Sequence, residues 1–174
     1  MTLFVAGVHA VGKTFVLKPV CESLGVRHAT ASQLIREQRG LASWTPSRLV
    51  DDVGENQRAL IAAVHRLEQE GQKIVLDGHF TLRRAVGIHE RIGLETYEQL
   101  RLRGVLLLEA ESAIIAERLL RRGDDSWSQA EIEVLAQAEL RHAEFICRQL
   151  DIPLARLHSP SEAEVQEVVA KLLG

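Results

Sequence analysis

The chain has 174 residues, 46% of them hydrophobic, which is enough for one well-buried core, so we expect a single domain spanning residues 1–174. A formal net charge of −3 argues against a broad electrostatic grip on nucleic acid or on an anionic membrane, and therefore favours small molecules or proteins as partners. The apolar stretches are far shorter than the roughly 20 residues that cross a bilayer, and no secretory segment is recognisable at the N-terminus, which favours a cytoplasmic protein.

The first informative segment is Gly7–Thr14, which reads Gly-Val-His-Ala-Val-Gly-Lys-Thr and matches the pattern G-x-x-x-x-G-K-T. The apolar run Leu3–Ala6 before it predicts a buried strand, and the spacing over Phe15–Leu24 predicts a helix. In that context the two glycines allow a tight loop of inward-pointing N–H groups, Lys13 supplies a charge to terminal phosphates, and Thr14 offers a hydroxyl to Mg²⁺. The segment therefore predicts a cradle for the phosphates of a nucleotide. We expect the nucleotide to contact Gly7, His9, Ala10, Val11, Gly12, Lys13, Thr14 and Phe15.

Short apolar runs alternate with helical patterns along the rest of the chain. Further strands are expected at Val26–Ala29, Ile74–Leu76, Val105–Leu108 and Pro153–Leu157. Further helices are expected from Ser32 onward and at Val53–Gln69, Leu94–Leu102, Ser112–Arg122, Gln129–Leu150 and Ser161–Leu172, with a loop at Gly40–Pro46 and a polar loop after Asp77. Strands without polar alternation are buried on both faces, so the pattern predicts a three-layer α/β/α fold with a five-stranded parallel sheet. Cys21 and Cys147 lie on the apolar sides of two helices and are expected to be reduced core residues.

The residues after each strand form the site in such a sheet, because ligands bind at the carboxyl ends of the strands. The third strand leads into Asp77, whose carboxylate can hold Mg²⁺ through water or accept a proton from an attacking hydroxyl; an Asp-Gly pair is also common turn chemistry. Glu109 ends the fourth strand and competes for the metal role. We choose Asp77 because aspartate is the more usual metal partner. His79 either contacts the acceptor or is hydrogen-bonded within its loop, and the side chain of His9 faces a similar choice.

Arginines stand where a transferring phosphoryl group needs positive charge. Arg36 follows the second strand, Arg83 follows the third, and Arg118 and Arg122 precede a polar stretch. The last two are four residues apart and share a helix face. Solvated surface charge is the alternative reading of all these arginines.

Asp51-Asp52-Val53-Gly54 matches the D-x-x-G of GTPases. No strand leads into it and no N-K-x-D element follows, so we expect these acids to cap the helix that begins near Val53. Asn56 and Gln57, in the first turns of that helix, either face the acceptor pocket or are polar surface.

Together, Gly7–Thr14, Ser32 with Arg36, Asp77-Gly78, and Arg118 with Arg122 resemble the small P-loop nucleoside and nucleotide kinases. The nearest types are archaeal adenylate kinases and AAA-type ATP-binding proteins of similar length. The resemblance implies ATP and Mg²⁺ as cofactors, with Thr14 and Asp77 at the metal, and a lid at about residues 122–129 that excludes water. It implies catalytic roles for Lys13, Asp77, Arg118 and Arg122. It implies acceptor contacts from Ser32, Arg36, His79 and Arg83, with a nucleoside monophosphate as the acceptor.

The sequence also departs from that family, because the Asp-Gly-Phe-Pro-Arg string of ordinary adenylate kinases is here Asp77-Gly78-His79-Phe80-Thr81, with Arg83 the nearest arginine. Two other functions therefore stay open. One is a small-metabolite kinase of the shikimate or gluconate type, with Asp77 as general base. The other is an ATP-binding regulator that acts through a protein partner, with His79, Phe80 and Trp44 on the contact surface.

Overall fold

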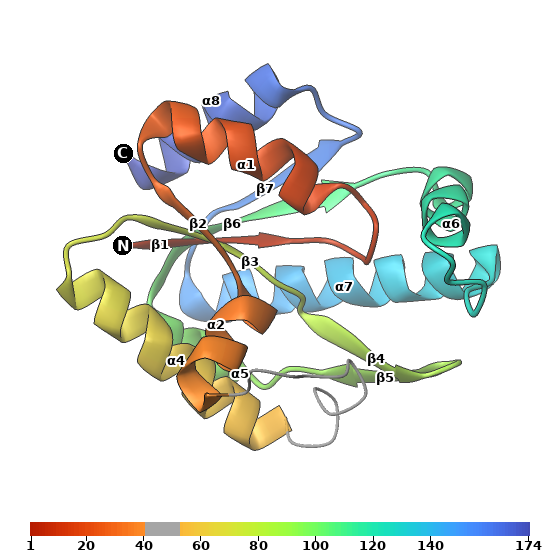
Figure 1. Ribbon diagram of the computed structural model, residues 1–174, viewed down its shortest axis with the longest axis horizontal. Coiled ribbons are helices and arrows are strands. Elements are labelled where there is room, and N and C mark those ends of the chain that lie inside the picture. Colours follow the sequence, from red (N-terminus) through yellow and green to blue (C-terminus); the bar gives the residue numbers. More distant parts are fainter. Residues whose placement is uncertain (41–52) are drawn as a thin grey trace.

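The structure is a computed structural model that describes residues 1–40 and 53–174. Its centre is a parallel sheet of five strands in the order β2-β3-β1-β6-β7 (Figure 1). These strands are β1 (Thr2–Ala6), β2 (Arg27–Thr30), β3 (Ile74–Asp77), β6 (Leu102–Glu109) and β7 (Leu154–His158). The helices are α1 (Lys13–Leu24), α2 (Ala31–Arg39), α4 (Val53–Gln69), α5 (Leu94–Leu100), α6 (Ser112–Arg121), α7 (Gln129–Leu150) and α8 (Glu162–Leu173). The predicted three-layer α/β/α fold is confirmed.

Strand β1 occupies the middle of the sheet and is buried along its whole length. Phe4 packs into a core with residues of α2, α4 and α5, whereas Leu3 packs into a second core with residues of α1, α6 and α8. Neighbouring residues of a strand point to opposite faces, so an unbroken apolar run serves both cores. Helix α7 contributes to both cores through Leu135 and Ile146. The pairing of Val5 with Asp77 places the phosphate loop beside the end of β3.

One prediction for the middle of the chain is wrong. The segment expected to be a polar loop after Asp77 contains an antiparallel hairpin of β4 (Thr81–Ala85) and β5 (Ile88–Arg91), joined through Gly87 at a φ of 70°. The hairpin stands apart from the main sheet, over the side covered by α5 and α7 (Figure 1). The helix predicted to reach Leu102 ends at Leu100, because Arg101 adopts a left-handed φ of 51°.

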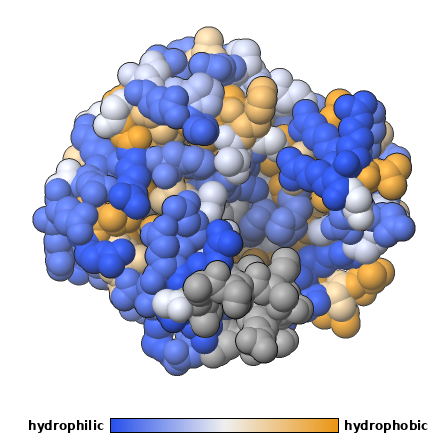
Figure 2. All heavy atoms as spheres, viewed as in Figure 1, coloured by the Kyte–Doolittle hydropathy of each residue, from blue (hydrophilic) through white to orange (hydrophobic). Residues whose placement is uncertain are grey.

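Cys21 and Cys147 are buried free thiols, as predicted. The predicted loop with Trp44 and the pair Asp51-Asp52 lie outside the described residues. Within the described ranges, no helix combines the length and the apolar character that a membrane span requires. The face shown in Figure 2 is mostly hydrophilic; hydrophobic residues gather at its lower right, over the β4–β5 hairpin, where Val86 and Ile88 are exposed.

Candidate functional site

A cavity of about 680 Å³ opens at the carboxyl ends of β1, β2 and β3. This is the edge at which doubly wound sheets bind ligands. Most of the predicted site residues line it, namely His9, Ala10, Val11, Gly12, Lys13, Thr14, Phe15, Ser32, Asp77, His79, Arg83 and Arg122. Gly7, Arg36 and Arg118 are not among its lining residues. Arg36 is exposed on α2, whose buried side carries Leu34 and Ile35.

The backbone of the phosphate loop has the conformation that an anion cradle requires. Gly7 and Gly12 have φ angles of 143° and 112°, and a Cβ on Gly7 would overlap the carbonyl oxygen of Leu108. Helix α1 begins at Lys13 with no side-chain cap, so the N–H groups of its first turn lack intrahelical acceptors. Unpaired N–H groups at a helix N-terminus bind phosphate oxygens.

Lys13, Thr14 and Asp77 converge at the base of the cavity. The Thr14 hydroxyl donates to Asp77 Oδ2 at 3.0 Å, and Lys13 Nζ lies 3.7 Å from Asp77 Oδ1. Lys13 also donates to the Gly7 carbonyl oxygen at 2.5 Å, so its ammonium group contacts the backbone of the phosphate loop. The pKa of Lys13 is lowered overall, because the effect of burial exceeds the opposite effect of the Asp77 and Glu139 carboxylates. An adjacent hydroxyl and carboxylate are oxygen ligands that suit Mg²⁺, which takes its remaining ligands from phosphates and water.

Glu109, the competing acid, lies elsewhere. Its two carboxylate oxygens each accept a hydrogen bond from Arg156 at 3.0 Å, and it is not among the residues that line the main cavity. His28 stands near Asp77 instead, with Nε2 at 3.8 Å from Oδ2 and no hydrogen-bond partner among the described residues. The geometry therefore favours Asp77 over Glu109 beside the phosphate loop.

Arg118 and Arg122 meet different surroundings. Arg118 donates to the carbonyl oxygens of Ala10 and Val11 at 3.2 and 2.8 Å, which ties α6 to the outer side of the phosphate loop. Arg122 is the C-cap of α6 and lines the cavity.

Both alternatives for His79 stay predictions, since the structure holds no acceptor and the Tyr97 hydrogen bond involves the backbone of His79. Its ring lines the cavity and lies 4.3 Å from the His9 ring, centroid to centroid, while its carbonyl oxygen accepts a hydrogen bond from the Tyr97 hydroxyl. Burial and the charge of Lys13 hold the pKa of His79 well below its usual value, so the ring is neutral near pH 7.

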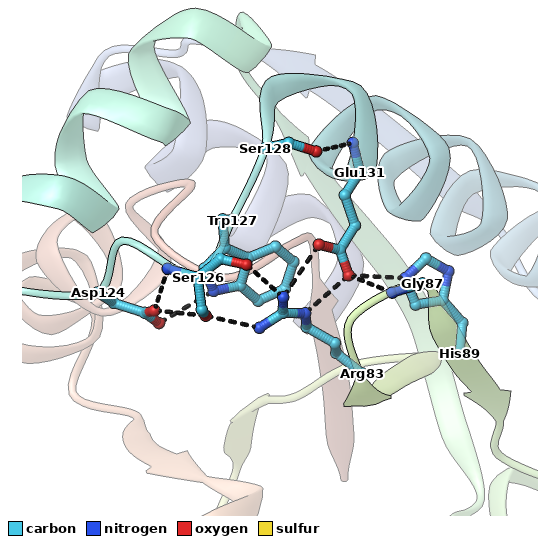
Figure 3. A network of polar contacts seen from close by, with 8 residues as sticks. All are labelled: Arg83, Gly87, His89, Asp124, Ser126, Trp127, Ser128 and Glu131. Carbon is cyan, nitrogen blue, oxygen red and sulfur yellow. Dashed lines mark hydrogen bonds and ion pairs between the residues drawn. The ribbon is translucent and has the colours of Figure 1, made fainter.

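Arg83 is the centre of a polar network around residues 122–128 between α6 and α7 (Figure 3). The sequence predicts a lid here, and this segment is called the lid below. Arg83 Nε and Nη2 donate to the two carboxylate oxygens of Glu131 at 2.8 and 2.9 Å. The same guanidinium donates to the hydroxyl and carbonyl oxygens of Ser126, and it stacks 3.9 Å above the ring of Trp127. The described contacts of Arg83 are thus made with the lid and α7.

The network extends on both sides of Arg83. Trp127 donates through Nε1 to Asp124 at 3.0 Å, so the indole is fixed within the lid, and its ring lies 5.8 Å from that of His9 in the phosphate loop. The N–H of Gly87 donates to Glu131 at 2.9 Å, which joins the hairpin turn to the same carboxylate. Hydrogen bonds from Arg83 and Gly87 lower the pKa of Glu131, so the carboxylate is ionised and the pair is charged.

Part of the cavity lining outside the phosphate loop consists of apolar and uncharged polar side chains. Its apolar side chains are Ile35, Leu60, Leu82, Ile92, Tyr97 and Leu100. Its polar side chains are Thr30, Ser32, Asn56, Gln57 and Thr96. The buried Oε1 of Gln57 has no hydrogen-bond partner among the described residues.

Sequence reasoning missed the acids of α7. Glu131 and Glu139 are 8% and 1% exposed and reach partners 48 and 59 residues away. A signal for both was present, because they repeat at i+4 spacing with the core residue Leu135, on the apolar side of the helix. An acid at such a position needs a partner.

Comparisons with known proteins agree with this geometry. A family model described as an AAA domain matches residues 6–136. A protein of Thermococcus onnurineus (strain NA1) named "Putative adenylate kinase" is 29% identical over 140 residues, which are 80% of this chain and 64% of that protein. The chain thus spans less than two thirds of that relative's length.

Two solved structures share the fold. A shikimate kinase from Acinetobacter baumannii is similar with a TM-score of 0.62 and 15% identity, over 98% of this chain and 91% of that chain. A gluconokinase from Sinorhizobium meliloti 1021 has a TM-score of 0.54 and 20% identity, over 98% of this chain and 90% of that chain. The chain therefore has the fold of these kinases.

Proposed function

The chain belongs to the AAA domain family, and we propose that it is a P-loop kinase. In this proposal it transfers the γ-phosphoryl group of ATP to a small acceptor, and a nucleoside monophosphate is the first candidate. One observation carries the proposal. Lys13, Thr14 and Asp77 meet in a cavity of about 680 Å³ whose lining continues past the phosphate loop to side chains of α2, α4 and α5. We infer that this continuation holds the acceptor.

The protein's part in the reaction is positioning and charge. Lys13 binds the terminal phosphates of ATP in place of the Gly7 carbonyl oxygen, to which it donates a hydrogen bond in the structure. Thr14 and Asp77 hold Mg²⁺, whose charge neutralises the phosphates when it is bound. Arg122 adds positive charge at the cavity wall, and the lid excludes water from the transferred group.

The part of the cavity inferred to hold the acceptor supports a nucleoside monophosphate through its lining. Its apolar side chains, such as Ile35, Leu60 and Tyr97, suit the faces of a nucleobase. Ser32, at the start of α2, faces the same space. The name of the Thermococcus relative supports the same acceptor class. Arg83 becomes a lid-positioning residue in this account, since its guanidinium is engaged by Glu131 and Ser126.

A hydroxyl-bearing metabolite is the second candidate acceptor, with Asp77 as general base. The hydroxyl side chains of Thr30, Ser32 and Thr96 around the cavity favour it, because they offer hydrogen bonds to a polyol. The two solved kinases with the same fold support this alternative.

Acceptor-dependent ADP release separates these functions. The purified protein is mixed with MgATP and, in separate reactions, with AMP, CMP, UMP, GMP, shikimate or gluconate, and ADP is followed by a coupled assay. We expect a nucleoside monophosphate to raise the rate by at least tenfold over ATP alone. A rate that rises only with shikimate or gluconate would select the second candidate. A rate that no acceptor changes would refute the kinase and favour an ATP-dependent regulator.

A further inference from the structure

Glu139 is a buried acid at the middle of α7, and its carboxylate meets two separate loops of the site. Oε1 accepts a hydrogen bond from the N–H of Gly7 at 3.3 Å. Oε2 accepts from the N–H of Thr81 at 2.7 Å, and both oxygens accept from the N–H of Phe80 at 2.9 and 3.0 Å. The residue is only 1% exposed, so backbone N–H groups take the place of the water that a carboxylate requires.

The two loops belong to opposite halves of the reaction. Gly7 opens the phosphate loop, where its φ of 143° and its close approach to Leu108 allow no other residue. Phe80 and Thr81 follow Asp77 and begin the hairpin that carries Arg83. A single carboxylate thus links the loop that faces the donor to the segment beside the acceptor. A packed helix gives it a fixed position, because α7 lies between both hydrophobic cores.

The ionisable groups around Glu139 fit this linking role. Lys13 and His79 face it from the phosphate loop and from the segment after β3, and Tyr97 faces it from α5. Of these, Lys13 bears a charge opposite to that of the carboxylate, and His79 Nδ1 lies 3.9 Å from Oε1. The charge of Lys13 lowers the pKa of Glu139, but burial raises it by more, so the pKa is about 7.

We propose that Glu139 is a positioning residue for phosphoryl transfer, whose carboxylate fixes the separation between the phosphate loop and residues 79–81 and so the distance at which donor and acceptor meet. The proposal rests on the proposed function, since it concerns the alignment of the two substrates. Glu139 is not among the residues that line the main cavity. A misplacement of about 1 Å in a catalytic site lowers rates by about 10²-fold, so the loss of this link is expected to appear mainly in kcat.

The test compares Glu139→Gln and Glu139→Asp with Glu144→Gln, a substitution of a partly exposed glutamate on the same helix. Glutamine keeps the size but replaces one acceptor oxygen by a donor group, whereas aspartate keeps the charge on a shorter side chain. We expect kcat to fall about 10²-fold in Glu139→Gln with the KM for ATP within about threefold, a smaller loss of about tenfold in Glu139→Asp, and no change in Glu144→Gln. A kcat within twofold of the wild type in Glu139→Gln would overturn the proposal.

Amide hydrogen exchange without substrates gives a second measurement that does not depend on turnover. We expect the amides of Gly7, Phe80 and Thr81 to exchange at least tenfold faster in Glu139→Gln, while those of Val105 and Leu106 in β6 stay as protected as in the wild type. Equal acceleration in β6 would mean a general structural role and would overturn the proposal. A wild-type protein that lacks acceptor-dependent turnover refutes the proposed function, whereas the exchange result still decides whether Glu139 links the two loops.

Discussion

Replacement of Arg83 by methionine removes the guanidinium from the lid network while keeping an unbranched side chain of similar length. The pair with Glu131 is largely buried, with side-chain exposures of 13% and 7%. Removing one partner of a fully buried ion pair costs about 3–5 kcal/mol, so the remaining exposure places the expected loss near 3 kcal/mol. The neighbouring pair Arg84 and Glu90 is 31% and 37% exposed, and an exposed pair contributes only about 0.2–1 kcal/mol. Arg84→Met is therefore a matched control one residue away.

Thermal unfolding followed by circular dichroism tests the difference. For a chain of this size, 1 kcal/mol corresponds to about 2–4 °C in Tm, so Arg83→Met is expected to unfold about 6–12 °C below the wild type and Arg84→Met within about 4 °C. Emission of Trp127, recorded in a Trp44→Phe background, should change only in Arg83→Met, because the guanidinium stacks on that indole. Equal Tm values in the two variants would refute the assignment of Arg83 to the lid.

Three further predictions concern Lys13, Asp77 and Glu139. At a MgADP concentration about 100 times Kd, bound ligand stabilises a protein by about 2.7 kcal/mol. We expect thermal unfolding to show this stabilisation for the wild type and for Lys18→Ala but not for Lys13→Ala. An equal stabilisation of Lys13→Ala would contradict the role of Lys13. Asp77→Asn should keep MgADP binding but lower acceptor-dependent turnover by about 10²–10³-fold, whereas Glu109→Gln should turn over at the wild-type rate. Full activity of Asp77→Asn would exclude Asp77 from the metal site. Burial raises the pKa of Glu139 to about 7 from an unfolded value near 4.5, so its stabilising contribution is full below about pH 4.5 and is lost as the pH rises through 7; urea unfolding should show that the wild type loses about 3 kcal/mol more than Glu139→Gln between pH 4.5 and 8, and equal losses would contradict the raised pKa of Glu139.

Local patterns in the sequence predicted the phosphate loop and the sheet. Gly7–Thr14 contains both the glycines that allow the loop and the first residues of α1. The apolar runs that become β1, β3 and β6 are buried on both faces of the sheet. The pairing of Asp77 with Thr14 follows from the parallel register of β1 with β3, which brings their carboxyl ends together. These features depend on residues close in sequence, or on the rule that the carboxyl ends of parallel strands lie at the same edge of a sheet.

What the sequence did not predict depends on distant partners. The β4–β5 hairpin was missed because Val86-Gly87 is a weak turn signal beside Asn-Gly or Asp-Gly, and its strands are partly exposed. Glu131 and Glu139 stand on an apolar helix face, but nothing local identifies Arg83 or the Gly7 N–H as their partners. An acceptor contact of Arg83 stays a prediction, because Arg83 lines the cavity while its guanidinium binds Glu131. The hairpin brings Arg83 to the lid (Figure 3).

Phosphorus NMR of the wild-type protein with MgATP and AMP tests the central claim most directly, because it follows the γ-phosphoryl group itself. Transfer through the Lys13, Thr14 and Asp77 site predicts that the resonances of ADP grow while the resonance of AMP declines, with little inorganic phosphate formed. CMP, UMP and GMP are then tested under the same conditions. Inorganic phosphate that forms at the same rate with and without every acceptor, and no phosphorylated product, would contradict the claim.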